Sequence, residues 1–123
     1  MAAPRLDDLL REAVALHQAG DLAGAEAAYR RILRRWKDDA NALHLLGVAL
    51  RQQGRLREAL QQLDRAVAAR PHDPLFRANR GAALADAGRL KEAVADLSRA
   101  ASARPGDATT LRNLGQAMAA QRT

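Results

Sequence analysis

Small residues recur at intervals of 34 positions along almost the whole chain. Gly47, Gly81 and Gly115 are separated by this interval. Three further sets keep the same interval: Gly20, Gly54 and Gly88; Ala25, Ala59 and Ala93; Asp39, Asp73 and Asp107. A fixed period of this length indicates a repeat array, in which each repeat buries its apolar face against its neighbours. The period therefore constrains the fold more than any other feature of the sequence.

Each repeat has the pattern of two helices joined by a tight turn. Asp39, Asp73 and Asp107 are predicted N-caps, because a carboxylate can accept hydrogen bonds from the free N–H groups of a first helical turn. Pro74 follows at the first helical position, where proline is tolerated. The glycine set that starts with Gly20 is predicted to end the first helix in the left-handed conformation. Apolar residues then recur at helical spacing in the second helix: Leu56, Ala59, Leu60, Leu63, Ala66 and Val67.

Gly47, Gly81 and Gly115 are predicted to lie in the middle of helices. Glycine there costs about 1 kcal/mol relative to alanine. A close approach by a neighbouring helix would offset this cost, because the missing side chain leaves room for it. We therefore expect each of these glycines at a helix–helix contact.

The composition favours helices and excludes several classes of protein. Hydrophobic residues make up 48% of the 123 residues and aromatic residues only 2%, so the apolar content is mainly alanine and leucine. Strands favour the aromatic residues that are scarce here. The absence of cysteine excludes a disulfide framework and a thiolate metal site. The N-terminal residues lack the apolar run of a signal peptide and no apolar stretch could span a bilayer, so we expect a cytoplasmic protein without a membrane span.

The net charge of +6 comes nearly all from arginine, and the basic residues alternate with acidic ones along the chain. The one dense basic cluster is residues 30–37. We interpret it as a solvated helix face. Single-strand nucleic-acid binding usually needs aromatic stacking residues, and only Trp36 is near this cluster. Nucleic acid is therefore an unlikely partner.

The repeat resembles the tetratricopeptide repeat family, whose 34-residue units carry small residues at positions 8, 20 and 27 and proline at position 32. The matching residues are Ala13, Gly47, Gly81 and Gly115 at position 8, and Ala25, Ala59 and Ala93 at position 20. At position 27 they are Ala66 and Ala100, and at position 32 they are Pro71 and Pro105. The resemblance implies an all-α fold, a right-handed α-solenoid of antiparallel helix pairs. It implies one domain over residues 1–123, with repeats 6–39, 40–73 and 74–107, a terminal helix 108–121, and about seven helices.

Several positions depart from the family pattern. Lys37 and Ile32 replace the usual proline and alanine in the first repeat, as expected of a terminal repeat. Arg77 and Arg80 replace larger or apolar residues, and we expect their aliphatic stems to pack while their charged ends reach solvent. The terminal helix has no second helix after it. It is either a capping helix or the point at which a longer array has been cut.

The resemblance implies that the first helices line a concave groove that binds a peptide or a partner helix. The candidate partner-binding residues are Arg11, Val14, His44, Leu45, Val48, Arg51, Asn79, Arg112, Asn113 and Gln116. Asn79 and Asn113 share one repeat position and resemble the asparagine ladder of the repeat domain in O-linked N-acetylglucosamine transferase. The alternative is that both are solvated or capping residues. The basic residues of the family's carboxylate clamp are mostly missing, so we predict no such clamp.

The sequence suggests no enzyme. His17, His44 and His72 lack metal-ligand spacing and are interpreted as surface histidines, and every glycine is accounted for by the repeat. We therefore predict no catalytic, metal or cofactor site and no small-molecule substrate. The leading hypothesis is a protein–protein interaction scaffold or adaptor. The alternatives are the N-terminal recruitment region of a larger bacterial transferase-type enzyme, or an assembly protein that associates with itself through Leu114 and Met118 of the terminal helix.

Overall fold

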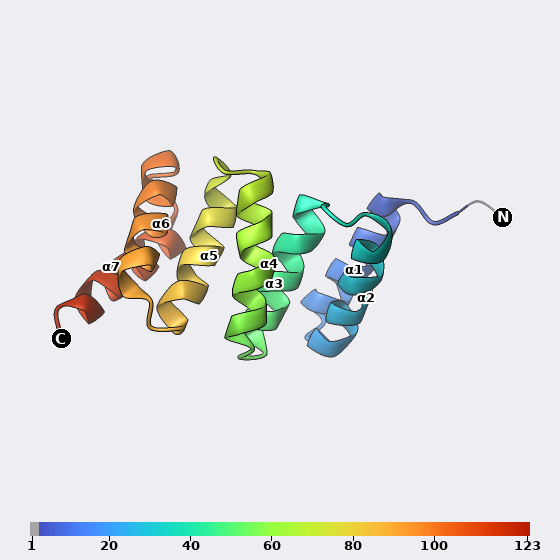
Figure 1. Ribbon diagram of the computed structural model, residues 1–123, viewed down its shortest axis with the longest axis horizontal. Coiled ribbons are helices and arrows are strands. Elements are labelled where there is room, and N and C mark those ends of the chain that lie inside the picture. The colour runs from blue at the N-terminus through green and yellow to red at the C-terminus, as the bar shows by residue number, and fades with distance from the viewer. Residues whose placement is uncertain (1–2) are drawn as a thin grey trace. The chain divides into compact units, whose positions relative to one another are not determined.

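Seven α-helices and no strand make up the computed structural model, which describes residues 3–123 (Figure 1). The helices are α1 (Leu6–Gln18), α2 (Leu22–Arg35), α3 (Ala40–Gln52), α4 (Leu56–Ala69), α5 (Pro74–Asp86), α6 (Leu90–Ala103) and α7 (Ala108–Gln121). The first helices after α1 begin at Ala40, Pro74 and Ala108, which reproduces the sequence interval. The predicted helix pairs are confirmed.

The helices form two compact halves, which are described separately. The N-terminal half ends at Ala66 and the C-terminal half is Val67–Thr123, so the boundary lies inside α4. In the N-terminal half, α1 packs on α2 and α2 packs on α3. In the C-terminal half, α5 packs on α6, α6 packs on α7, and α5 also touches α7. The assignment of residues 1–123 to a single domain stays a prediction.

A left-handed glycine ends the first helix of each complete pair. The φ angles of Gly20, Gly54 and Gly88 are +85°, +79° and +78°. In each turn, the N–H of the residue after the glycine donates to a carbonyl five positions earlier, as in Arg55 N to Leu50 O at 3.0 Å. This bond closes the helix end only if the glycine has a positive φ, which costs other residues conformational energy. The predicted role of these glycines is confirmed.

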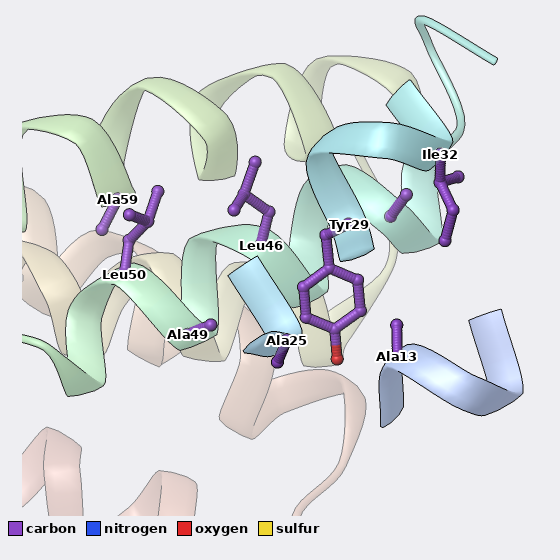
Figure 2. Packing of buried hydrophobic residues seen from close by; sticks show 9 residues of the cluster. Ala13, Ala25, Tyr29, Ile32, Leu46, Ala49, Leu50 and Ala59 are labelled. Atoms are coloured by element: carbon purple, nitrogen blue, oxygen red, sulfur yellow. The ribbon is translucent and has the colours of Figure 1, made fainter. Parts of the chain in front are cut away.

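Alanines and one tyrosine dominate the core of the N-terminal half (Figure 2). Ala13, Ala25 and Tyr29 are fully buried, and Ile32 is 1% exposed. Because Ala13 and Ala25 are small, α1 and α2 can approach closely, and the Tyr29 ring lies beside them with its hydroxyl directed past both (Figure 2). The cluster is completed by Ala42, Leu46, Ala49 and Leu50 of α3 and by Ala59 of α4.

Two of the three mid-helix glycines lie at the expected close contacts. A Cβ on Gly47 would lie 2.6 Å from Leu63 Cγ, and a Cβ on Gly81 would lie 2.7 Å from Leu97 Cγ. The prediction is wrong for Gly115, because a Cβ there would meet no atom within 4 Å. Leu63 and Leu97 belong to the second helices α4 and α6, and within residues 3–123 no leucine of a second helix lies against Gly115.

Arg77 and Arg80 do not direct their charged ends into solvent, so that prediction is wrong. Both guanidinium groups bind Asp96 of α6, whose side chain is only 5% exposed. Arg77 Nη1 donates to Asp96 Oδ1 at 3.0 Å, and Arg80 donates from Nε to Oδ2 at 2.6 Å and from Nη2 to Oδ1 at 2.8 Å. The Asp96 cluster, defined as these three residues, therefore holds α5 and α6 together with ionic hydrogen bonds.

All three predicted aspartates are the N-cap residues of their helices. Asp39 accepts from Ala42 N at 2.9 Å, and Asp73 accepts from Leu75 N at 2.9 Å. The Asp107 carboxylate differs, because it accepts from the Thr110 hydroxyl at 2.9 Å. That hydrogen bond holds the pKa of Asp107 below its ordinary value. Thr110 is 97% buried, so the carboxylate supplies the acceptor that its hydroxyl needs.

Candidate functional site

Six candidate binding residues lie on the first helices of the N-terminal half. Arg11 and Val14 belong to α1, and His44, Leu45, Val48 and Arg51 belong to α3. Arg11 is exposed, whereas Val14, Leu45, Val48 and Arg51 are half-buried. Half-buried apolar side chains flanked by arginines form a surface that a partner could cover further. His44 differs from the rest because only 5% of it is exposed.

A hydrogen-bonded chain joins the C-terminal ends of α1 and α3. His17 Nδ1 lies 2.9 Å from the Tyr29 hydroxyl, and His17 Nε2 bonds to Gln52 Oε1. An imidazole that donates from Nε2 and accepts at Nδ1 from Tyr29 satisfies all three groups. Burial raises the pKa of Tyr29 to about 12, so the phenol stays protonated and able to donate. These two bonds link the end of α1 to both α2 and α3.

The interpretation of all three histidines as surface residues is wrong for His44. His44 is buried and makes an interaction within the chain, and His17 is half-buried between Tyr29 and Gln52. His72 is exposed as predicted. The sequence could not reveal the pairing of His17, because Gln52 lies 35 positions away. A buried His44 leaves five candidates on this face with more accessible side chains.

Four candidate binding residues lie on α5 and α7 of the C-terminal half, and these helices touch. Asn79 of α5 and Asn113 of α7 are half-buried, whereas Arg112 and Gln116 are exposed. Asn79 already has an interaction partner within the chain. A partner would therefore have to exchange or share that interaction. The structure brings the two helices that carry these asparagines together, and a role for the asparagines in binding stays a prediction.

An ionic cluster that the sequence analysis missed connects α2 with the beginning of α4. Arg55 Nη1 donates to Glu26 at 2.6 Å, and its Nε and Nη2 form a fork on Glu58 at 3.1 and 2.8 Å. Arg30 also binds Glu26, at 2.9 Å. The spacing of Glu26 and Arg30 by four positions was a visible signal for one helical ion pair. The bond between Arg55 and Glu26 spans 29 positions and had no sequence signal.

The Glu26 carboxylate predicts a stability loss in acid. Burial alone would raise the pKa of Glu26, but hydrogen bonds from Arg30, Arg55 and Gln53 outweigh it, so the pKa lies below its ordinary value of 4.5. A lowered folded-state pKa gives stability that is present above 4.5 and lost as the pH falls through the lowered value. We expect Glu26→Gln to flatten the dependence of unfolding free energy on pH between about pH 5 and pH 3.

Urea unfolding at several pH values, followed by circular dichroism, measures this effect. The matched control is Glu12→Gln, since Glu12 is exposed and forms no ion pair within residues 3–123. The control should keep the pH dependence of the parent chain. Identical pH profiles for Glu26→Gln and the parent would contradict the predicted role of Glu26.

The basic cluster at residues 30–37 is largely the solvated face that its sequence indicated. Arg31, Arg34 and Arg35 are exposed, and the Arg35 guanidinium lies 4.7 Å from the centre of the Trp36 ring. Arg30 is the exception because it binds Glu26 and Glu58. The one tryptophan of the chain is thus covered on one face by an arginine of its own cluster.

The terminal helix α7 exposes apolar side chains. Leu111 is 46% exposed and Met118 is 41% exposed, and Leu114 between them is half-buried. Gly115 lies on the same stretch with open space where a side chain would be. The sequence indicated Leu114 and Met118 as contact residues, whereas the exposure of Leu111 is seen only in the structure. Self-association through this helix stays a prediction.

Within residues 3–123, no group of three or more His, Asp or Glu side chains is placed to hold a metal ion. None of the described helices combines the length and the apolar character that crossing a membrane requires.

Comparison with protein families gives a match over most of the chain. The family model of the tetratricopeptide repeat matches residues 10–74 and again residues 44–108. A comparison with curated protein sequences gives no match.

Solved structures share the arrangement of the helices. A mutant O-GlcNAc transferase from Thermobaculum terrenum is similar to 95% of the chain at 29% identity, with a TM-score of 0.88, and the chain covers only 23% of that protein. The first TPR of Spaghetti (RPAP3), bound to an HSP90 peptide, is 18% identical with a TM-score of 0.90, and the match covers 96% of this chain and 94% of that one.

The Yersinia enterocolitica type III secretion chaperone SycD, in complex with a peptide of the translocator YopD, is 16% identical with a TM-score of 0.84. The match covers 98% of this chain and 97% of SycD. The last two likenesses show the fold alone. Together with the family match over residues 10–108, they establish the fold class as all-α, of the helical-repeat solenoid type. The chain belongs to the tetratricopeptide repeat family.

Proposed function

We propose that the chain is a cytoplasmic protein-interaction scaffold that binds a peptide or a partner helix on its first helices. The observation that carries the proposal is the pair of half-buried asparagines at one repeat position, Asn79 and Asn113, on the touching helices α5 and α7. An amide side chain can donate and accept at once, which suits recognition of a peptide backbone. In the N-terminal half, the first helices α1 and α3 offer a second contact surface, which is apolar and consists of Val14, Leu45 and Val48.

Two neighbours of the same fold support a peptide as the ligand. Spaghetti (RPAP3) and SycD were each solved with a peptide bound. Their identity to this chain is below 20%, so their peptides indicate the kind of ligand rather than its sequence. Because this chain lacks most of the basic residues of a carboxylate clamp, the proposed ligand is not an acidic tail held by its terminal carboxylate.

The experiment starts from peptides selected against the full chain in a display library. The double variant Asn79→Ala, Asn113→Ala is expected to bind the selected peptides about thirtyfold more weakly, because each of the two lost amides removes about 1 kcal/mol of hydrogen bonding. Fluorescence anisotropy with a labelled peptide measures the dissociation constant. The matched control Arg31→Ala, Arg34→Ala changes two exposed residues of α2 and should leave binding unchanged.

Thermal unfolding of both variants separates a loss of binding from a loss of folding, which matters because Asn79 also interacts within the chain. Equal affinity of the parent and the asparagine variant, with both folded, would show that the asparagines do not bind the peptide.

A second candidate is that the chain serves as the recruitment region of a larger transferase. The 29% identity to the Thermobaculum terrenum O-GlcNAc transferase over 95% of this chain favours it. In this case the repeats would hold a protein substrate by the same first-helix residues. The sequence that follows Thr123 in the native gene distinguishes the two candidates.

A further inference from the structure

An open cavity of about 630 Å³ lies at one corner of the C-terminal half, between the start of α5 and the last turns of α6. We call it the basic corner and define it by His72, Pro74, Arg77, Ser98, Arg99 and Ser102. No carboxylate lines it. His72, Ser98, Arg99 and Ser102 are exposed, so their polar groups are accessible to a ligand.

The two arginines that line this corner, Arg77 and Arg99, differ in their contacts within the protein. Arg77 is fixed, because its Nε donates to Pro71 O at 2.7 Å and its Nη1 donates to Asp96. Its Nη2 takes part in neither bond. Arg99 forms no ion pair with any carboxylate in the described part of the chain. The corner thus combines a rigid guanidinium with one that has no counterion within the protein.

The side chains that line the corner carry positive charge, because Arg77 and Arg99 are basic and no lining residue is acidic. Asp96 faces both Arg77 and Arg80, so one carboxylate serves two guanidinium groups. Arg99 adds a further positive charge. Ser98 and Ser102 are four positions apart on α6, so their hydroxyls lie on the same side of the helix as neighbours.

The preceding repeat provides an internal comparison, because the residues 34 positions earlier form the equivalent corner. Asp38 occurs there in place of His72, and Asp64 in place of Ser98. Leu43 and Ala68 replace Arg77 and Ser102, and Arg65 corresponds to Arg99. Arg65 is occupied, since it pairs with Asp38 at 3.5 Å and donates to Lys37 O at 2.9 Å.

The two corners therefore lie at the same positions of successive repeats but differ in charge. The earlier corner has two aspartates and one arginine, whereas the basic corner has two arginines and no carboxylate. The preceding repeat folds with Asp38, Leu43, Asp64 and Ala68 at the positions of His72, Arg77, Ser98 and Ser102, so packing does not require these four side chains. We propose that the basic corner binds a phosphate monoester, with Arg77 and Arg99 neutralising its charge and Ser98 and Ser102 donating to its oxygens. The site is on the second helix α6 and does not depend on the peptide-binding proposal.

The chemistry of the donors favours phosphate over carboxylate. Guanidinium groups form paired, charge-assisted hydrogen bonds with phosphate oxygens, and hydroxyls supply neutral donors. A phosphate monoester carries close to two negative charges and three terminal oxygens at neutral pH. A carboxylate has one charge and two oxygens, which leaves more of the corner's donors without an acceptor.

The test is a titration of the full isotopically labelled chain with inorganic phosphate at constant ionic strength, followed by amide chemical shifts. We expect saturable shifts concentrated at His72, Ser98, Arg99 and Ser102, and much weaker effects from acetate. Arg99→Gln should weaken binding at least fivefold, and Ser98→Ala, Ser102→Ala should weaken it in the same direction. The matched control Arg65→Gln, in the preceding repeat, should bind phosphate as the parent does.

The natural ligand could be a phosphorylated partner or free phosphate. Two further ligands, a short phosphoserine peptide and its unphosphorylated form, distinguish between them. Tighter binding of the phosphopeptide than of inorganic phosphate assigns the site to a phosphorylated partner. Equal binding of the two phosphates assigns it to free phosphate. Shifts that do not saturate, shifts spread over all basic surfaces, or an unchanged affinity in Arg99→Gln would each overturn the proposal.

Discussion

Replacing Asp96 with alanine is expected to lower the free energy of unfolding by about 3 kcal/mol. The carboxylate is nearly buried, and the side chains of its two partners, Arg77 and Arg80, are only 15% and 22% exposed. Removing it takes away the buried carboxylate that both guanidinium groups share. Charged groups that stay largely buried after losing such a bond keep the cost of their lost solvation, and this cost adds to the energy of the bonds themselves.

The preceding repeat supplies the control for this prediction. Its equivalent positions are Leu43, Leu46 and Gln62, so the same packing site is occupied there without any charge. The triple variant Arg77→Leu, Arg80→Leu, Asp96→Gln copies that arrangement. We expect its stability to lie within about 1 kcal/mol of the parent or above it, because apolar residues of similar volume often replace buried ion clusters without loss.

Urea unfolding followed by circular dichroism compares the two variants, and amide hydrogen exchange in α5 and α6 locates the change. A single Asp96→Ala variant as stable as the parent would show that Arg77 and Arg80 reach solvent once released. A triple variant as unstable as Asp96→Ala would show that the ionic cluster itself stabilises the fold.

One added methyl group is expected to have opposite effects at Gly47 and at Gly115. At Gly47, a Cβ would lie 2.6 Å from Leu63 Cγ and 3.3 Å from Ala59 O, and Leu63 is fully buried. The helices must move apart, so we expect Gly47→Ala to destabilise the chain by about 1–3 kcal/mol. At Gly115 the methyl meets nothing, and Gly115→Ala should stabilise the chain by about 1 kcal/mol through helix propensity.

Thermal unfolding of the two alanine variants against the parent measures both signs. Gly81→Ala is the matched repeat of the first case, because its Cβ would lie 2.7 Å from Leu97 Cγ. Stabilisation at all three positions would mean that helix propensity outweighs contact and that α3 and α5 do not pack as closely as described. Destabilisation by Gly115→Ala would indicate that another chain already covers α7.

The sequence predicted which helices carry the candidate binding residues, but it did not predict the burial of each side chain. The repeat positions predicted that all ten candidate residues lie on first helices, and they do. The same positions made Asn79 and Asn113 equivalent, and the structure shows that the helices that carry them touch. It could not show that His44 is buried, because burial depends on which side chains of other helices surround it. It also missed Leu111, since exposure at α7 follows from the absence of a covering helix in the described chain rather than from any local pattern.

The sequence by itself determined the repeat interval, the seven helices, the left-handed glycines and the close contacts at Gly47 and Gly81. These features depend on short-range rules that recur in every repeat: a cap, a positive φ, an apolar period. Only the tertiary structure decided which charges meet, as in Asp96 with Arg77 and Arg80, and Arg55 with Glu26. The reason is physical: an ion pair between helices depends on side-chain directions across 16 to 29 positions, which the helical period does not encode.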